Sequence, residues 1–286
     1  MNANMQRDAL GLLGDSPERD YARKLVLFNA FAAPELREAV SSLGLEPGMT
    51  VLDAGCGTGE TLLWIQDAVS PSGLVVGIDL SAAHSIVARA AAKPPTAVIQ
   101  ASVSHPPLRA SSFDLIWCAN TIHHLRDPLA AALTLMSLLR PRGRIVFAQS
   151  SLLPELLFAW DSGLERRVTD AVRRYYQERY AISDDDLSRV RGIVGLARRA
   201  QLRNVTARTI MIERISPLAP ADHDYLLEGI FRSTWGERLK PFLSPDDFMQ
   251  LSELCDPRSR HFALRRPDFH YVQSLTFVTG HNAPSL

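Results

Sequence analysis

The chain has 286 residues, of which 46 % are hydrophobic and 22 % charged, as expected of a globular protein with one large domain or a domain and a cap. Its 31 basic and 31 acidic residues cancel, which disfavours a protein that grips nucleic-acid backbones over a wide basic face. No apolar run approaches the roughly 20 residues that span a bilayer, and no signal peptide is evident, so we expect a cytoplasmic location. Three widely spaced cysteines predict neither a disulfide framework nor a zinc site.

The first predicted elements are two helices. Apolar residues recur every three or four positions from Tyr21 to Phe31, as one buried helix face requires. Pro34 opens a second helix, which the turn residues Glu46-Pro47-Gly48 end. We expect residues 1–48 to form an N-terminal helical lid.

Short apolar runs then alternate with stretches of helical character. Strands are expected at Thr50–Ala54, Leu74–Leu80, Ala97–Ala101, Phe113–Ala119 and Arg144–Ala148, and helices at Thr61–Val69, Ala82–Lys93 and Pro128–Leu139. Strands that are nearly all apolar and alternate with helices indicate a parallel sheet covered on both faces. Residues 49–151 are therefore predicted to form a doubly wound α/β core.

The rhythm changes after Ser151. Apolar positions from Leu157 to Tyr175 mark a long amphipathic helix within a helical insertion over 152–204. A core strand over 205–216, a cap insertion over 217–268, and a final strand and tail over 269–286 complete a seven-stranded, mostly parallel sheet. Ligands of such sheets bind beyond the carboxyl ends of the strands, so the insertions are expected to roof a substrate compartment. The alternative is that they only enlarge the core.

The stretch VLDAGCGTGET, from Val51 to Thr61, carries closely spaced glycines after the first strand. Its third glycine comes one position too early for the dinucleotide fingerprint, and no lysine follows as in a phosphate loop. The acidic residues Asp53 and Glu60 would repel a close phosphate and suit a ligand with a positive charge. Asp79, at the end of the second strand, can accept hydrogen bonds from both hydroxyls of a ribose. Together they predict a nucleoside without a phosphate signature.

These motifs resemble those of a known superfamily. VLDAGCGTGET followed by VVGIDLS is similar to the first two motifs of class I S-adenosylmethionine-dependent methyltransferases, and FDLIWCANTIHHLRDP and LLRPRGRIVFAQ resemble the small-molecule (UbiE and natural-product) branch. The resemblance covers about Thr50 to Ser150. It implies a Rossmann-like methyltransferase fold with S-adenosylmethionine as cofactor.

The resemblance also implies roles for single residues. The backbone of Gly55, Gly57 and Gly59, with Cys56 and Thr58 between them, would approach the methionine part of the cofactor, with Asp53 near its ammonium group. Asp79 would take the ribose hydroxyls and Leu80 would pack on the adenine.

Further roles fall on later strands and on the lid. Asn120, after the fourth strand, would lie near the amino acid end of the cofactor. Many relatives carry an acid after the third strand that accepts from the adenine amino group, whereas this chain has Ser102 and Val103. A hydroxyl and a backbone amide there would bind the adenine more weakly than a carboxylate. Tyr21 would contact the cofactor or the substrate from the lid.

Two histidines are the candidates for a catalytic base. His123 and His124 follow the fourth strand at the edge of the predicted crevice, and such a base is useful only if the acceptor must lose a proton. The alternative is that one of them packs against or caps the next helix, which begins at Asp127-Pro128. Tyr175 and Tyr176 are adjacent on a predicted helix, so at most one of them lines a pocket. No metal site is predicted.

We therefore predict a methyltransferase that acts on a small, partly aromatic or apolar metabolite in specialised biosynthesis, with no nucleic-acid or membrane partner. The alternatives are an NAD-type oxidoreductase, a non-catalytic S-adenosylmethionine-binding scaffold and a nucleic-acid methyltransferase. The clusters Arg166-Arg167, Arg173-Arg174 and Arg198-Arg199 are interpreted as solvated helix faces. The acceptor atom and the oligomeric state stay open.

Overall fold

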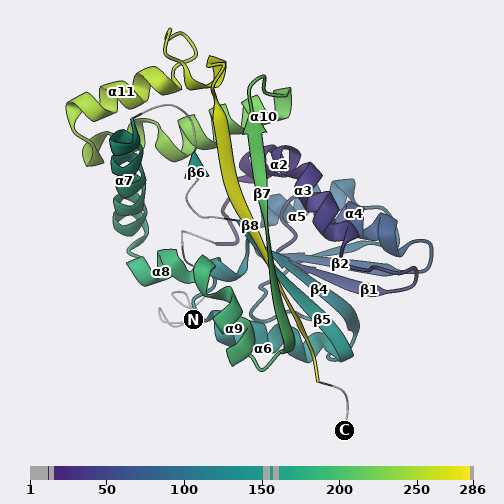
Figure 1. Ribbon diagram of the computed structural model, residues 1–286. Coiled ribbons are helices and arrows are strands. Elements are labelled where there is room, and N and C mark those ends of the chain that lie inside the picture. Colours follow the sequence, from purple (N-terminus) through teal and green to yellow (C-terminus); the bar gives the residue numbers. More distant parts are fainter. Residues whose placement is uncertain (1–11, 13–15, 151–154, 157–160, 284–286) are drawn as a thin grey trace.

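The computed structural model describes residues 12, 16–150, 155–156 and 161–283 (Figure 1). These residues form an eight-stranded sheet in the order β3-β2-β1-β4-β5-β8-β6, with β7 also paired to β8. The strands are β1 (Thr50–Ala54), β2 (Leu74–Asp79), β3 (Ala97–Gln100), β4 (Phe113–Ala119), β5 (Leu139–Ser150), β6 (Glu155–Leu156), β7 (Arg203–Ile215) and β8 (His270–His281). The predicted seven-stranded, mostly parallel sheet is confirmed, and the two-residue β6 is added to it.

The helices of the described residues surround this sheet and extend beyond one end of it. The α-helices are α2 (Ala22–Phe31), α3 (Ala33–Ser41), α4 (Glu60–Val69), α5 (Ala82–Ala91), α6 (Pro128–Leu138), α7 (Ser162–Tyr180), α8 (Asp184–Ser188), α9 (Ile193–Arg199), α10 (Pro220–Asp224) and α11 (Pro245–Cys255). A π-helix, η4 (Tyr225–Trp235), and the 3₁₀ segments η2 (Ile122–His124), η3 (Arg189–Gly192), η5 (Glu237–Phe242) and η6 (Ala263–Arg265) lie between them.

The strand order explains where a ligand can bind. β1 pairs in parallel with β2 on one side and with β4 on the other, so the chain winds outward in both directions from β1. Such a reversal leaves a crevice beyond the carboxyl ends of β1 and β4. β8 runs antiparallel to both β5 and β7 and closes the far side of the sheet.

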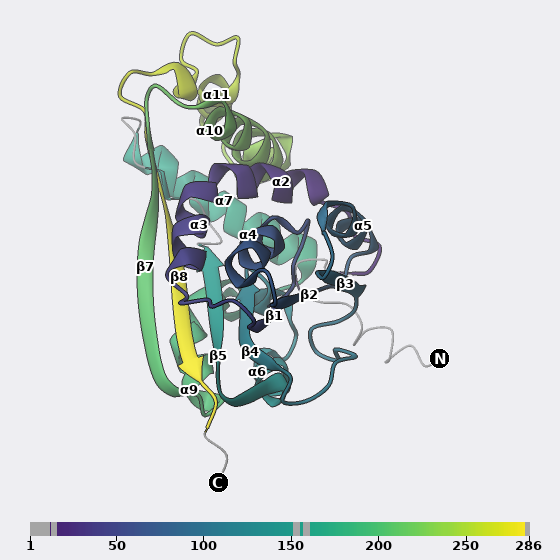
Figure 2. The same cartoon turned by 90° about the vertical axis from the view of Figure 1, so that its right-hand side faces the viewer.

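The sheet is buried on both faces because its strands carry apolar side chains on each. Val51 of β1 belongs to the core under α3 and α4, and its neighbour Leu52 belongs to the core under α6 and α9. Both side chains have 0 % exposure. This two-sided packing is visible edge-on, with α4 and α5 on one side of the sheet and α6 and α9 on the other (Figure 2). It is the reason that the strands read as continuous apolar runs.

Several helix ends follow from local side chains. Ser81 caps α5 by accepting a hydrogen bond from the His84 N–H, and Asp127 caps α6 in the same way from Ala130. Helix α5 ends before the predicted Lys93, because Pro94 disfavours helical backbone in the residue before it. Strand β5 begins at Leu139, earlier than predicted, so it takes the last residue assigned to the preceding helix.

The two insertions behave differently. In the first, α7 packs against η5 at the end of the sheet that faces the lid, whereas α9 packs against α6 and β7 and enlarges the core. The amphipathic helix α7 begins at Ser162, and the predicted positions Leu157 and Trp160 lie outside the described residues. The second insertion places α10 and η4 on α2 (Figure 1). The lid helix is therefore held between the core and this cap.

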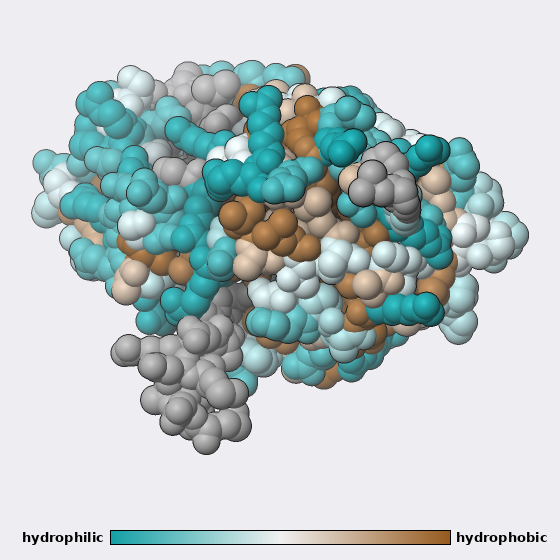
Figure 3. All heavy atoms as spheres, turned by 90° about the horizontal axis from the view of Figure 1, so that it is seen from below, coloured by the Kyte–Doolittle hydropathy of each residue, from teal (hydrophilic) through white to brown (hydrophobic). Residues whose placement is uncertain are grey.

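The surface seen from below is largely hydrophilic, with apolar groups between the polar ones (Figure 3). In the part of the chain that the structure describes, no helix has the length and apolar character that a bilayer crossing demands.

Candidate functional site

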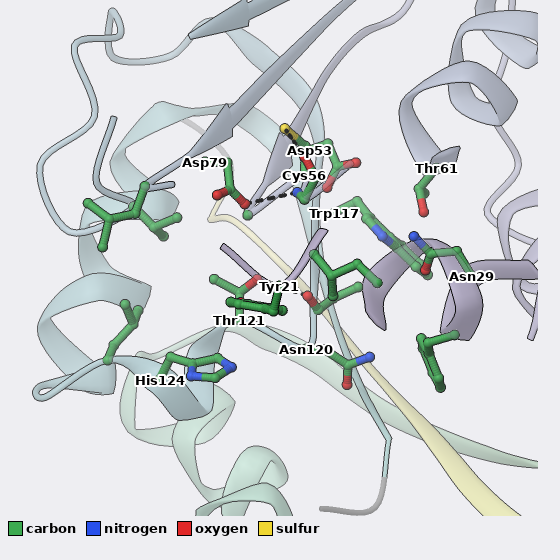
Figure 4. A pocket seen from close by; sticks show the side chains of 18 of the residues that line it. Tyr21, Asn29, Asp53, Cys56, Thr61, Asp79, Trp117, Asn120, Thr121 and His124 are labelled. Atoms are coloured by element: carbon green, nitrogen blue, oxygen red, sulfur yellow. Dashed lines mark hydrogen bonds between the residues drawn. The ribbon is translucent and has the colours of Figure 1, made fainter. Parts of the chain in front are cut away.

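A cavity lies at the carboxyl ends of β1, β2 and β4, where the strand order predicts a crevice. Its empty space, including its open mouth, is about 900 Å³. Asp53 and Asp79 lie on one side of it, and Asn120 and His124 on the other (Figure 4). Helix α2 closes it with Leu25, Phe28 and Asn29. We call this space the first cavity.

Most of the residues predicted to bind a cofactor line this cavity. They are Tyr21, Asp53, Gly55, Cys56, Gly57, Asp79, Leu80, Ser102, Val103 and Asn120. Thr58 and Gly59 do not line it. The Thr58 hydroxyl donates to Glu60 Oε2 at 2.6 Å, and Gly59 faces helix α5. Residues that come from five separate loops of the sequence are thus brought to one space.

Asp53 places a buried carboxyl group without a described hydrogen-bond partner for its Oδ2 atom at the base of the first cavity. Its side chain is 2 % exposed, and its Oδ2 atom has no hydrogen-bond partner in the described structure. Burial, with Asp79 and Glu60 nearby, raises the pKa of Asp53 to about 8. A buried carboxyl group without a partner is costly unless it is protonated or meets a cation. The cavity therefore suits a positively charged ligand group at this point.

Asp79 is held by three groups around it. Its Oδ2 accepts from the Gly57 N–H at 2.9 Å, and its Oδ1 accepts from the Ser81 N–H at 2.9 Å and lies 3.2 Å from His84 Nδ1. His84 in turn meets the Tyr21 ring edge-on, with ring centroids 4.4 Å apart. Asp79 thus connects the glycine loop to the lid. Sequence reasoning missed His84, whose only signal is its place in the first turn after Ser81.

Contacts within the protein are enough to require glycine at two positions of the loop. Gly55 has φ +83°, and a Cβ atom there would lie 2.0 Å from the Thr121 hydroxyl. Gly59 has φ +93°, and its Cβ would lie 3.0 Å from Ala88 in helix α5. Only glycine adopts such backbone freely. The predicted reason for these glycines, close approach by a ligand, is therefore not needed at either position.

Glu60 ties the loop to the lid. Its Oε2 accepts from Asn29 Nδ2 of helix α2 at 2.7 Å, in addition to the Thr58 hydroxyl. Glu60 does not line the first cavity. From the sequence, Glu60 is interpreted as an acid that repels a close phosphate, and in the structure its carboxylate links the glycine loop to helix α2.

A second cavity, with about 1260 Å³ of empty space including its open mouth, adjoins the first. The two share a wall made of Tyr21, Leu25, Phe28, Asn120 and His124. Tyr176 of α7, Tyr225 of η4 and the lid residue Lys24 line its far part. Tyr175, next to Tyr176, packs instead on Phe242, in agreement with the expectation that at most one of the pair faces a pocket.

Both predicted catalytic histidines line the second cavity, and His124 also lines the first. His123 Nδ1 lies 2.9 Å from Gln149 Oε1, which can only accept, so the ring carries its proton on Nδ1. Burial lowers the pKa of His123 to about 4 and that of His124 well below its ordinary value. Neither ring caps helix α6, because Asp127 does so. Both rings are neutral at pH 7, and the Nδ1 of His124 has no hydrogen-bond partner within the described chain.

Asn120 presents a donor on the shared wall. It adopts left-handed backbone with φ +48°, which places its side chain beside β5. Its Oδ1 accepts from Gln149 Nε2, from the Ser150 N–H and from the Ser150 hydroxyl at 2.8–3.0 Å. The oxygen is therefore saturated, and the Nδ2 hydrogens remain for a ligand.

Comparisons with known proteins agree with this geometry. Residues 52–147 match the family described as "Methyltransferase domain". Over 120 residues the chain is 34 % identical to nocamycin O-methyltransferase of Saccharothrix syringae, covering 40 % of this chain and 42 % of that protein. Over 118 residues it is 28 % identical to demethylmenaquinone methyltransferase of Lactococcus lactis, covering 40 % of this chain and 47 % of that protein. The chain contains a class I, S-adenosylmethionine-dependent methyltransferase domain.

The fold of the methyltransferase domain has a solved counterpart. The YcgJ protein of Bacillus subtilis superposes with a TM-score of 0.56 at 15 % identity, covering 88 % of this chain and all of that one. This likeness concerns the fold alone. The chain spans less than half the length of the curated relatives named above.

The residues of the first cavity fit S-adenosylmethionine, the cofactor of this class. Two acids, Asp53 and Asp79, line the cavity, and no lysine or arginine does so among the residues described. The buried Asp53 Oδ2 lacks a partner that a cationic group of the cofactor would supply. The observed donor and acceptor set is therefore that of a site for a cationic nucleoside.

Proposed function

We propose that this chain is a methyltransferase of the cytoplasm that uses S-adenosylmethionine to methylate a small, partly aromatic metabolite in specialised biosynthesis. Two joined cavities carry the proposal. The first contains the Asp53 carboxyl group, whose Oδ2 has no described partner, and the second lies across the wall that holds Asn120 and His124. One space for a cationic nucleoside beside one for a further molecule is the arrangement that group transfer requires.

When bound, the cofactor supplies a methyl group on a sulfonium centre. In this proposal Asp53 holds the ammonium group, and Asp79 orients the ribose hydroxyls from a side chain already fixed by its neighbours. Ser102 and Val103, which line the first cavity with Leu80, would contact the adenine. The lid and the cap over 217–268 exclude water and bring acceptor and cofactor together.

Burial limits the proton transfer that the two histidines can perform. A ring with a pKa far below 7 is a weak base, so it removes a proton readily only from an acidic group. His124, which lines both cavities, is the better placed of the two to meet the acceptor atom. We propose that it accepts the proton of an acidic hydroxyl or holds an already ionised one.

The test is the binding of S-adenosylhomocysteine, measured by calorimetry on the purified chain. We expect micromolar affinity and a loss of about tenfold or more in Asp79→Ala, because several hydrogen bonds of the site depend on that carboxylate. Asp67→Ala, an exposed acid on α4, is the matched control and should bind as the unmodified chain does. Absence of detectable binding in a folded sample would contradict the proposal.

Other outcomes favour the alternatives. Tight binding without transfer of a labelled methyl group to any small molecule of a cell extract indicates a non-catalytic scaffold. Stabilisation by a nicotinamide cofactor indicates an oxidoreductase, and salt-dependent RNA retention indicates a nucleic-acid methyltransferase. The nucleic-acid alternative is disfavoured by two ion pairs. Arg167 pairs with Asp247 and Arg173 pairs with Asp184, so these arginines are less available to bind phosphates.

A further inference from the structure

The two cavities carry opposite charge. Acids line the first, whereas the second is lined by Arg19, Lys24 and Arg238 and, among the described residues, by no aspartate or glutamate. His123 and His124 are neutral, so the positive charge of this cavity comes from the lysine and the two arginines. A group of like charges in a partly desolvated space attracts a ligand of the opposite charge.

Lys24 is the most informative of these cations. Its only hydrogen bond within the described chain goes from Nζ to the Thr234 hydroxyl at 3.3 Å, and that hydroxyl itself donates to the Gly229 carbonyl. Burial, with Arg238 and Arg19 nearby, lowers the pKa of Lys24 to about 8. An ammonium group in such a place is unfavourable unless an anion meets it.

The chain pairs a comparable cation fully elsewhere. Arg214, whose side chain is 12 % exposed, meets Glu35 at 2.6 Å and Asp222 at 2.7 Å. Neither Lys24 nor Arg238 has an acidic partner in the described part of the chain, although both face the interior of a cavity. Arg238 lies over the Tyr175 ring, 5.0 Å from its centroid, and Lys24 has no acid beside it among the described residues. Both cations are thus placed to pair with a bound anion.

The walls around these cations are aromatic. Tyr176 and Tyr180 stack one turn apart on α7, with ring centroids 5.9 Å apart, and Tyr225 lines the same space. Rings of this kind pack on flat, unsaturated ligands and leave their hydroxyls for polar contacts. Lys24 and Arg238 line only the second cavity, so an anion bound there lies away from the shared wall.

We propose that the second cavity binds a flat aromatic acceptor through an anionic group, a carboxylate or a phosphate, that pairs with Lys24 and Arg238. The anion anchors one end of the acceptor and directs the other end to the shared wall at His124. This inference rests on the proposed function, because it takes the second cavity as the acceptor site.

The experiment measures the binding of matched aromatic probes to the chain saturated with S-adenosylhomocysteine. 4-Hydroxybenzoate and 2-naphthoate supply the carboxylate, phenylphosphonate supplies the phosphorus anion, and 4-hydroxybenzamide and 2-naphthamide are uncharged counterparts of the same shape. We expect the acids to bind about tenfold or more tightly than the amides, since a charged hydrogen bond is lost in the amides. Whether the phosphonate or the carboxylates bind more tightly decides which anion the site prefers.

Substitutions then test the assigned residue. Lys24→Met should abolish the preference for the acids, Lys24→Arg should retain it, and the exposed Lys93→Met should leave it unchanged. Equal affinity for acids and amides would overturn the proposal, and so would the absence of binding by every acid at millimolar concentration. Because S-adenosylhomocysteine binding is measured first on each sample, its loss identifies a failure of the proposed function, and its retention with no anion preference identifies a failure of this inference alone.

Discussion

At the scale of single residues, Asp53 shows how a site can be recognised without its ligand. A carboxyl group that is buried, unpartnered and close to two other acids is unfavourable in the empty protein. We propose that this cost serves a function, the attraction of a cationic group of the ligand. The two histidines differ in their contacts. Gln149 orients the His123 ring, whereas Nδ1 of His124 has no hydrogen-bond partner among the described residues.

Cofactor affinity should depend on pH through Asp53. Its pKa of about 8 means that the carboxyl is protonated in the empty protein below that pH, and a cationic ligand favours the ionised form. Binding should therefore release a proton, and affinity for S-adenosylhomocysteine should rise by up to about tenfold per unit between pH 5.5 and 7.5. Calorimetry in two buffers of different ionisation enthalpy measures the released proton.

Asp53→Asn is the matched variant, because it keeps the shape of the side chain and removes the titration. It should bind with little pH dependence over the same range. The empty variant should also melt above the unmodified chain at pH 7.5. Since a folded pKa above the unfolded value loses stability as pH rises from about 4 to 8, that difference should narrow toward pH 4. A pH-independent affinity in the unmodified chain would show that Asp53 does not meet the cation.

At the scale of elements, the lid helix α2 is attached at both ends. Near its start Tyr21 contacts His84, and toward its end the Phe31 carbonyl accepts from Arg214 Nη2 at 2.6 Å. Between them Asn29 reaches Glu60 at the beginning of α4. Helix α2 therefore closes the first cavity by side-chain contacts to the very loop that the cofactor would touch.

Removing the middle attachment should speed cofactor release. Asn29→Ala leaves the Glu60 carboxylate with one donor fewer, and we expect about tenfold weaker binding of S-adenosylhomocysteine, mainly through a faster dissociation rate. Stopped-flow fluorescence gives both rate constants. Arg23→Ala, on an exposed position of the same helix, controls for the loss of a side chain from the lid. An unchanged dissociation rate would mean that the Asn29 contact does not hold the lid closed.

The elements of the core were predictable from the sequence, and the contacts between distant elements were not. Apolar runs such as Val75 to Ile78 predict a buried parallel strand, because helices cover both faces of such a sheet. No local pattern predicts the hydrogen bond between Asn29 and Glu60, or that between Lys24 of the lid and Thr234 of η4, 210 residues away. The sequence predicts that the insertions are helical. It does not predict which of their helices pack on the core and which form the cap, because that depends on tertiary packing. The candidate cofactor residues and the histidine pair follow strand ends, which the sequence marks, whereas the other residues that line the second cavity come largely from the lid and the insertions.

At the scale of the whole molecule, the net charge is zero, but the charges inside the protein are distributed unevenly between the two cavities. Acids gather at the first cavity and cations at the second, on two sides of one wall. Composition alone disfavoured a broad basic face but could not reveal this division. The charges of the two cavities favour a cation in one and an anion in the other, so each of the two proposed ligands should reduce an electrostatic cost of the empty fold.

That cost should be measurable at Lys24 in the empty protein. A folded pKa of about 8, below the ordinary 10.5, means that the charged ammonium destabilises the fold at neutral pH, and that the penalty is relieved as pH rises from about 8 to 10.5. The free energy of unfolding of the unmodified chain, minus that of Lys24→Met, should therefore rise by about 1–2 kcal/mol between pH 7.5 and 9.5, allowing for partial solvent screening. Urea denaturation at the two pH values measures it, and the subtraction removes groups that titrate alike in both proteins. Lys93→Met, which changes an exposed lysine, should show no such rise. A flat difference for Lys24→Met would show that neither burial nor the neighbouring Arg238 and Arg19 destabilises the charged ammonium.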